Sequence, residues 1–257
     1  MRKLSIGGRV FDIEVAVFDK DGLLFDSITF WRELAQARLD ASLQYIDEET
    51  ACGWLDLMDV SLVRDENSGL CVTEVKADGV TAVASPDEET MITATFLLQK
   101  LHCSWPEARE LSRKIFMEGD RRIDMKKAIS PKKGFPGIFQ RLRAAGIPYG
   151  IATSDDLRRA QCSIDMFDDF KLLNFVITPK DVKNNKPATD MLDLVAAKYH
   201  VDAKNILMVG DSYVDVEMAS NAGAVGVGIP EFQDMKEKML PYVTVLADTL
   251  DDIMVVD

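Results

Sequence analysis

The chain has 257 residues, of which 30 are basic and 43 acidic, giving a formal net charge of −13. This excess of acidic side chains argues against nucleic acid or an anionic membrane surface as a general partner, because both require a basic protein face. The length is sufficient for two domains, each with its own core.

Cysteine usage and hydropathy indicate the expected compartment. The four cysteines show no CxxC spacing and no metal-like grouping with the two histidines, so we expect reduced thiols. No apolar stretch has the length of a signal peptide or of a membrane-spanning helix. We therefore expect a cytoplasmic protein.

The first predicted elements are a hairpin and a buried strand. Two short segments rich in apolar residues, 4–6 and 10–13, lie on either side of Gly7 and Gly8, a pattern typical of two short antiparallel strands. Residues 15–18 then form an uninterrupted apolar run, which is typical of a strand buried on both faces of a parallel sheet.

Two carboxylates follow that strand at once. Asp19 and Asp21 precede Gly22, so both can approach one ligand at the carboxyl end of the strand, where open α/β sheets bind their ligands. Two anions held this close repel each other unless a cation lies between them, and a hard divalent ion with oxygen ligands fits best. A solvated Asp-Gly turn is the alternative for this stretch taken alone.

Residues 28 to about 129 are predicted to form a mainly helical block without strand–helix alternation. Ser27 can cap a first helix that extends to about residue 45. Capping boxes at Ser85 and Ser104 each precede an amphipathic helix. Between these helices, residues 52–86 are consistent with a short helix followed by loops or a hairpin.

From Pro131 onward, strands and helices alternate. The predicted strands are 147–152, 175–177, 205–209, 225–229 and 243–246, and the predicted helices include 135–145, 188–199, 215–222 and a short last one opened by Thr249. Repeated strand–helix units require a parallel sheet with right-handed crossovers. We therefore predict a doubly wound parallel α/β domain formed by residues 1–27 and 131–257, with residues 28–130 inserted as a second, mainly helical domain.

Polar residues also follow the later strands. Thr153 and Ser154 offer hydroxyls to a phosphoryl group, or else an ordinary helix cap. Lys186 precedes a predicted helix, and the alternative is an ordinary solvated surface lysine. Asp211 and Asp215 follow a predicted strand, and the alternative is that they cap the next helix. Together, a candidate nucleophile, a hydroxyl, an amine and an acid come in order at successive strand ends. Unrelated helix caps and surface charges do not explain this order.

These motifs resemble those of the haloacid dehalogenase superfamily, in its phosphoglycolate-phosphatase-like branch with a helical cap. The matching segments are residues 17–24, 151–153, 186–190, and 209–215 continuing into 221–224. Leu23 stands where many members have Thr, and Thr189 stands where a second Pro is common. Lys183 is a nearby alternative to Lys186, although the Lys-Pro step favours Lys186.

The resemblance implies a magnesium-dependent phosphatase that acts on a small phosphorylated metabolite. Asp19 would be the nucleophile that forms an aspartyl-phosphate, and Asp21 would be the general acid and base. Thr153, Ser154 and Lys186 would hold the phosphoryl oxygens.

The resemblance also implies the ligands of the metal. Mg²⁺ would be bound by the Asp19 carboxylate, the backbone carbonyl of Asp21 and the Asp211 carboxylate, with Asp215 acting from outside these direct ligands.

The sequence argues against two of three alternative functions. A sugar-phosphate mutase shares every residue of the core site. A haloacid dehalogenase needs neither the second aspartate nor a metal, so Asp21 and Asp211 argue against it. A non-catalytic binding protein on the same scaffold would lack the nucleophile, the lysine or the metal acid, and none of these is missing.

Overall fold

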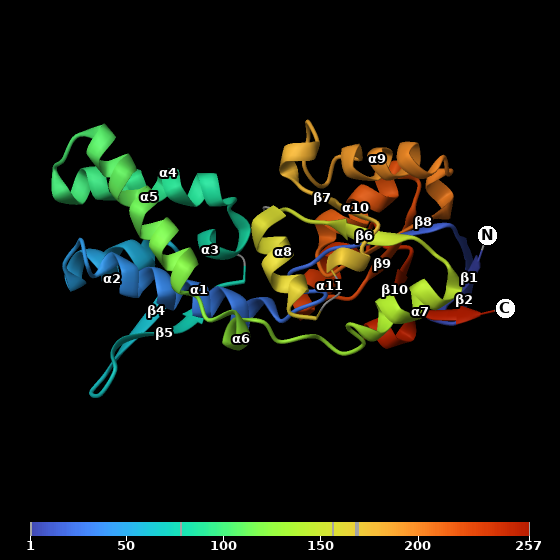
Figure 1. Ribbon diagram of the computed structural model, residues 1–257, viewed down its shortest axis with the longest axis horizontal. Coiled ribbons are helices and arrows are strands. Elements are labelled where there is room, and N and C mark those ends of the chain that lie inside the picture. Colours follow the sequence, from blue (N-terminus) through green and yellow to red (C-terminus); the bar gives the residue numbers. More distant parts are fainter. Residues whose placement is uncertain (1, 78, 156, 168–169, 257) are drawn as a thin grey trace. The chain divides into compact units, whose positions relative to one another are not determined.

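The computed structural model describes residues 2–77, 79–155, 157–167 and 170–256 (Figure 1). The chain forms two compact units. Unit 1 consists of Met1–Asp26 and Pro131–Asp257, and unit 2 is Ser27–Ser130.

Unit 1 is built on a six-stranded parallel sheet with the order β10-β9-β8-β3-β6-β7. Its strands are β3 (Val15–Phe18), β6 (Tyr149–Ala152), β7 (Phe175–Ile177), β8 (Ile206–Gly210), β9 (Val225–Gly228) and β10 (Val245–Leu246). The strand order reverses at β3, which pairs with β6 on one side and β8 on the other. This topology confirms the predicted α/β class, and sheets of this kind bind ligands at the carboxyl ends of the strands where the order reverses, which here is the end of β3.

Helices cover both faces of this sheet (Figure 1). Those of unit 1 are α7 (Gly137–Ala145), α8 (Leu157–Asp165), α9 (Asp190–Tyr199), α10 (Tyr213–Ala222) and α11 (Gln233–Met239). On one face Val15 and Val17 share a core cluster with buried residues of α9 and α10. On the other face Phe18 packs edge-on against Phe139 of α7, with ring centroids 5.3 Å apart. Every residue of β3 is buried, as the apolar run predicts.

The predicted N-terminal hairpin is present as β1 (Arg2–Ile6) and β2 (Arg9–Ile13), which pair antiparallel around Gly7 and Gly8. A third strand, β11 (Met254–Val256), pairs with β1 and was not expected from the sequence. The predicted last helix is a single 3-10 turn, one of four short 3-10 segments in the described part of the chain. They are η1 (Phe170–Leu172), η2 (Pro179–Asp181), η3 (Ala203–Asn205) and η4 (Leu250–Asp252).

Unit 2 is mainly helical but contains a two-stranded antiparallel sheet. Its elements are α1 (Ser27–Ser42), α2 (Glu48–Leu57), β4 (Val60–Asp65), β5 (Gly69–Val75), α3 (Val80–Val83), α4 (Pro86–Leu101), α5 (Trp105–Arg122) and α6 (Met125–Ala128). The hairpin alternative for residues 52–86 is therefore correct. Both capping boxes are confirmed, since Ser85 N donates to Glu88 and Ser104 N to Glu107, each at 2.8 Å.

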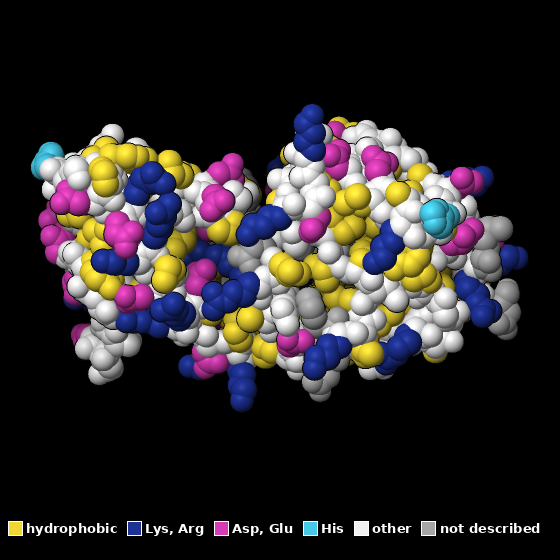
Figure 2. Space-filling view, turned by 45° about the horizontal axis from the view of Figure 1, so that its top comes forward, with side chains coloured by type: hydrophobic (Ala, Val, Ile, Leu, Met, Phe, Trp, Pro, Cys, Tyr) yellow, Lys and Arg dark blue, Asp and Glu magenta, His cyan; other side chains and the backbone are white. Residues whose placement is uncertain are grey.

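Across the described residues, no helix is long and apolar enough to cross a membrane. All four cysteines are free thiols, as expected. Lysine and arginine side chains are interspersed with aspartate and glutamate over the face shown in Figure 2.

Candidate active site

Three carboxylates converge at the carboxyl ends of β3 and β8. Asp19 directly follows β3, and its backbone N–H donates to Val209 O of β8 at 2.9 Å. Asp211 directly follows β8, and Asp215 lies in the first turn of α10. One carboxylate oxygen from each of the three lies within 4.8 Å of the others.

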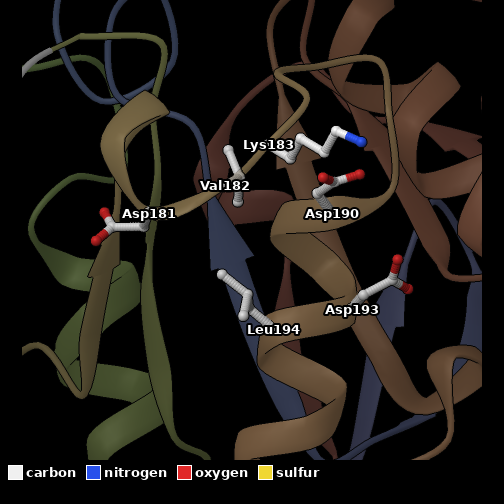
Figure 3. A pocket seen from close by; sticks show the side chains of 6 residues that line it. All are labelled: Asp181, Val182, Lys183, Asp190, Asp193 and Leu194. Atoms are coloured by element: carbon white, nitrogen blue, oxygen red, sulfur yellow. The ribbon is translucent and has the colours of Figure 1, made fainter.

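Lys186 connects two of these carboxylates. Its Nζ donates to Asp19 Oδ1 and to Asp215 Oδ1, both at 2.6 Å, and its side chain is only 2% exposed. The alternative, Lys183, instead lines an open surface pocket of about 320 Å³ beside α9, where its side chain lies next to that of Asp190 (Figure 3). The two lysines are therefore in different surroundings, and Lys186 is the one that contacts the carboxylates.

Asp215 has two structural roles at once. Its Oδ2 accepts from Ser212 Oγ at 2.8 Å in a capping box at the start of α10, while its Oδ1 accepts from Lys186. Gly210 is required here, because a Cβ at that position would overlap the Asp215 side chain. The helix-cap alternative and the site role are therefore compatible.

Burial and mutual repulsion disfavour the ionised forms of the carboxylates in this cluster. Burial, together with repulsion from Asp215, raises the pKa of Asp19 to about 7 even though Lys186 opposes the rise. Burial and the charges of Asp19, Asp215 and Glu231 raise the pKa of Asp211 well above its usual range. Although burial opposes the charged form of Lys186, the Asp19 and Asp215 carboxylates raise its pKa.

This donor set fits a hard divalent cation. Carboxylate oxygens within a few ångströms of one another are the ligands that Mg²⁺ prefers, and a cation would offset both the burial and the mutual repulsion that raise the pKa values of Asp19 and Asp211.

The side chain of Asp21 has different partners from that of Asp19. Lys20 Nζ lies 2.5 Å from Asp21 Oδ1 and 3.1 Å from Asp155 Oδ2. Burial raises the pKa of Asp21, while Lys20 opposes the rise. Sequence reasoning missed both Lys20 and Asp155, although a lysine between two site aspartates was a signal available in the sequence.

Thr153 and Ser154 differ in exposure. Thr153 directly follows β6, is 2% exposed, and accepts a hydrogen bond at Oγ1 from Asp155 N at 3.0 Å. Ser154 is exposed. Because β6 is the neighbour of β3, Thr153 lies at the same carboxyl edge of the sheet as Asp19.

A fourth acid, also missed, lies beside Asp211. Glu231 follows β9, its side chain is 8% exposed, and Lys132 Nζ binds its Oε1 at 2.6 Å. A Cβ added at Gly22 would meet both Glu231 and Asp211, so all three are close together. The sequence signal was an acidic residue shortly after a predicted strand.

The chain is similar in sequence to known hydrolases. A sequence model of the haloacid dehalogenase-like hydrolase family matches residues 13–223. Phosphoglycolate phosphatase from Escherichia coli (strain K12) is 35% identical over 88 residues, covering 34% of this chain and 35% of that enzyme, so the match spans about a third of the relative's length. N-acetylmuramic acid 6-phosphate phosphatase from Pseudomonas aeruginosa is 24% identical over 212 residues, covering 82% of this chain and 79% of that protein.

Solved structures share the fold. A protein assigned as a β-phosphoglucomutase from Thermotoga maritima superposes with a TM-score of 0.64 at 18% identity, covering 93% of this chain and 96% of the other. A protein from Haemophilus somnus that is assigned as a phosphoglycolate phosphatase superposes with a TM-score of 0.64 at 15% identity, covering 94% of this chain and 96% of the other. The family match takes in Asp19, Lys186 and Asp211 in one span of more than half of the sequence, so the chain belongs to the haloacid dehalogenase-like hydrolase family.

Proposed function

We propose that the protein is a magnesium-dependent phosphatase that hydrolyses a small phosphorylated metabolite through an aspartyl-phosphate on Asp19. The observation that carries this proposal is the buried Lys186, bonded to Asp19 and Asp215 next to Asp211. Phosphoryl transfer requires a nucleophile, a fixed positive charge and a group of carboxylates that can bind a metal ion. The phosphatase relatives support the same reaction class.

The metal would be held by the carboxylates of Asp19 and Asp211 and the backbone carbonyl of Asp21, with Asp215 orienting this set. When bound, Mg²⁺ supplies positive charge that offsets the carboxylates and the phosphoryl oxygens. Lys186 and the hydroxyls of Thr153 and Ser154 would hold the remaining phosphoryl oxygens.

In the first step, a carboxylate oxygen of Asp19 attacks phosphorus and the ester P–O bond breaks. The bonding pair passes to the leaving oxygen, which takes a proton from the Asp21 carboxyl. In the second step, Asp21 accepts a proton from water as the water oxygen attacks phosphorus. The bond from phosphorus to Asp19 then breaks, which releases inorganic phosphate and restores the Asp19 carboxylate.

We also propose that unit 2 is the substrate-selecting domain, since the family resemblance gives inserted helical domains this role. Substitutions in unit 2 would then change the ranking of substrates but not the dependence on Asp19. An unchanged ranking across such variants would contradict this assignment.

The test is phosphate release from a panel of phosphorylated metabolites, including 2-phosphoglycolate and N-acetylmuramic acid 6-phosphate, with Mg²⁺ or with a chelator. We expect release from at least one ester, abolition by the chelator, and a loss of about 10³-fold or more in Asp19→Asn. No release from any ester, or release unaffected by Asp19→Asn, would overturn the proposal.

A sugar-phosphate mutase is the second candidate, because mutases of the family share every residue of the core site, and one structural neighbour carries that assignment. At such low identity the likeness concerns the fold alone. The same panel distinguishes the two, since a mutase converts a sugar phosphate to its isomer with little free phosphate.

A further inference from the structure

Lys20 is a buried charge that the proposed chemistry does not use. It lies between the nucleophile and the general acid, and its side chain has no exposed surface. Buried ammonium groups are strongly disfavoured unless carboxylates surround them, so this position requires specific partners.

Two carboxylates in different loops lie next to its ammonium group. Nζ lies 2.5 Å from Asp21 Oδ1, in the loop after β3, and 3.1 Å from Asp155 Oδ2, in the loop after β6. Asp155 is itself fixed, because its N–H donates to Thr153 Oγ1 at 3.0 Å and Arg159 Nη1 lies 3.6 Å from its Oδ1.

From this geometry we infer that Lys20 is a positioning residue, which fixes the carboxyl group of Asp21 relative to the loop after β6 that contains Thr153 and Asp155. The inference rests on the proposed function. Lys20 contacts Oδ1, so proton exchange with the leaving oxygen and with water falls to Oδ2, and the Asp21 side chain keeps 19% exposure. A proton donor held in one orientation transfers its proton more efficiently than one that samples several.

The alternative is that Lys20 only stabilises the loops. A double-mutant cycle separates the two roles, because a residue that acts through Asp21 loses its effect once Asp21 cannot exchange a proton. The variants are Lys20→Met, Asp21→Asn and the double variant. Each is assayed as kcat and KM on an alkyl phosphate and on an aryl phosphate, with the melting temperature and Mg²⁺ affinity measured alongside.

We expect Lys20→Met to lower kcat on the alkyl phosphate by about 10²-fold and on the aryl phosphate by less than about 10-fold, since an aryl leaving group needs little protonation. In the Asp21→Asn background, Lys20→Met should reduce kcat by less than about twofold further. Lys204→Met, which removes an exposed lysine 3.2 Å from Asp202, is the control and should leave both rates unchanged.

Equal losses on both substrates, or a full additional loss in the Asp21→Asn background, would overturn the inference and leave Lys20 a purely structural residue. If Lys20→Met does not fold, Asp155→Asn enters the same cycle and must give the same leaving-group dependence. These outcomes differ from failure of the proposed function, in which the unmodified protein releases no phosphate from any ester.

Discussion

Asp19 and Asp21 are separated by one residue, yet their carboxyl groups have different partners. Asp19 is bonded to Lys186 in the carboxylate cluster, and Asp21 is bonded to Lys20. In the proposed first step Asp19 must be ionised and Asp21 protonated, so separate environments for the two carboxyls are what this reaction needs.

Asp21→Asn should therefore lower turnover of an alkyl phosphate by about 10²- to 10⁴-fold, because the leaving oxygen loses its proton donor. The loss should be smaller on an aryl phosphate, and Mg²⁺ affinity should persist because only the backbone of Asp21 is a proposed ligand. Steady-state kinetics and calorimetry measure both. Full turnover of an alkyl phosphate by this variant would show that Asp21 is not the acid.

Metal binding should depend on pH. Asp19 has a pKa of about 7 and that of Asp211 is also raised, so ionisation of these groups opposes folding. Without metal, stability should fall as the pH rises from the usual carboxyl range through about 7. Added Mg²⁺ should raise the melting temperature more at about pH 8 than at about pH 5.5, where protons compete for the same oxygens. An equal increase at both values would contradict this account.

Much of the site geometry could be predicted because carboxyl ends of neighbouring parallel strands meet at one edge. This rule brings together Asp19, Asp211 and Asp215, as observed. It does not show which residues Lys20 and Glu231 contact, since loop conformation decides which buried charges meet, and loops follow no periodic pattern.

The turn after β3 depends on Gly22. Its φ is +78°, and a Cβ there would overlap Asp211 and meet Glu231. Gly22→Ala should therefore weaken Mg²⁺ binding and lower activity by about 10-fold or more, since it displaces a proposed ligand. Calorimetric titration with Mg²⁺ measures the first effect.

Gly8→Ala is the matched control for this change. Gly8 has a similar φ of +75°, and an added Cβ would meet nothing within 4 Å. It shares the backbone strain but not the overlap, so its metal affinity should equal that of the unmodified protein. Equal losses of affinity in the two variants would mean that strain alone is responsible.

In unit 2, a buried arginine joins three helices. Arg38 of α1 lies 2.9 Å from Glu89 of α4 and 3.3 Å from Asp120 of α5, and its guanidinium lies 4.1 Å from the centroid of the Phe116 ring. Arg38→Met should reduce the free energy of unfolding by about 3–5 kcal/mol, because it leaves the Glu89 carboxylate buried without its guanidinium partner. Urea unfolding measures this loss.

Arg64→Met is the control, because Arg64 forms an exposed ion pair with Glu48. Ion pairs between exposed side chains contribute little to stability, so this variant should keep the free energy of unfolding of the unmodified protein. If both variants lose the same stability, the buried pair has no special role.

The longer elements were predictable, whereas several short ones were not. The capping boxes mark the starts of α4 and α5 correctly, because serine and glutamate at that spacing satisfy exposed helix N–H groups. Strand β11 has three residues and forms only by pairing with β1 at the opposite end of the sequence. Such pairing leaves no periodic pattern to detect.

The chain as a whole combines a parallel-sheet unit, which holds all the proposed catalytic groups, with an inserted helical unit. Its net charge of −13 makes attraction of an anionic phosphate ester dependent on local cations. In unit 1, Lys186 is a buried cation bonded to Asp19, and a bound Mg²⁺ would add to its positive charge.

The proposed function depends on covalent transfer of the phosphoryl group to Asp19, which can be tested by trapping the phosphorylated enzyme. Asp21→Asn should accept phosphate from an aryl ester but hydrolyse the intermediate slowly, since the water lacks a base. Rapid acid quenching and mass spectrometry should then find one phosphoryl group on the peptide that contains Asp19, and none in the Asp19→Asn/Asp21→Asn double variant. Phosphate release without any phosphorylated Asp19 peptide, or a phosphoryl group on another residue, would contradict the account.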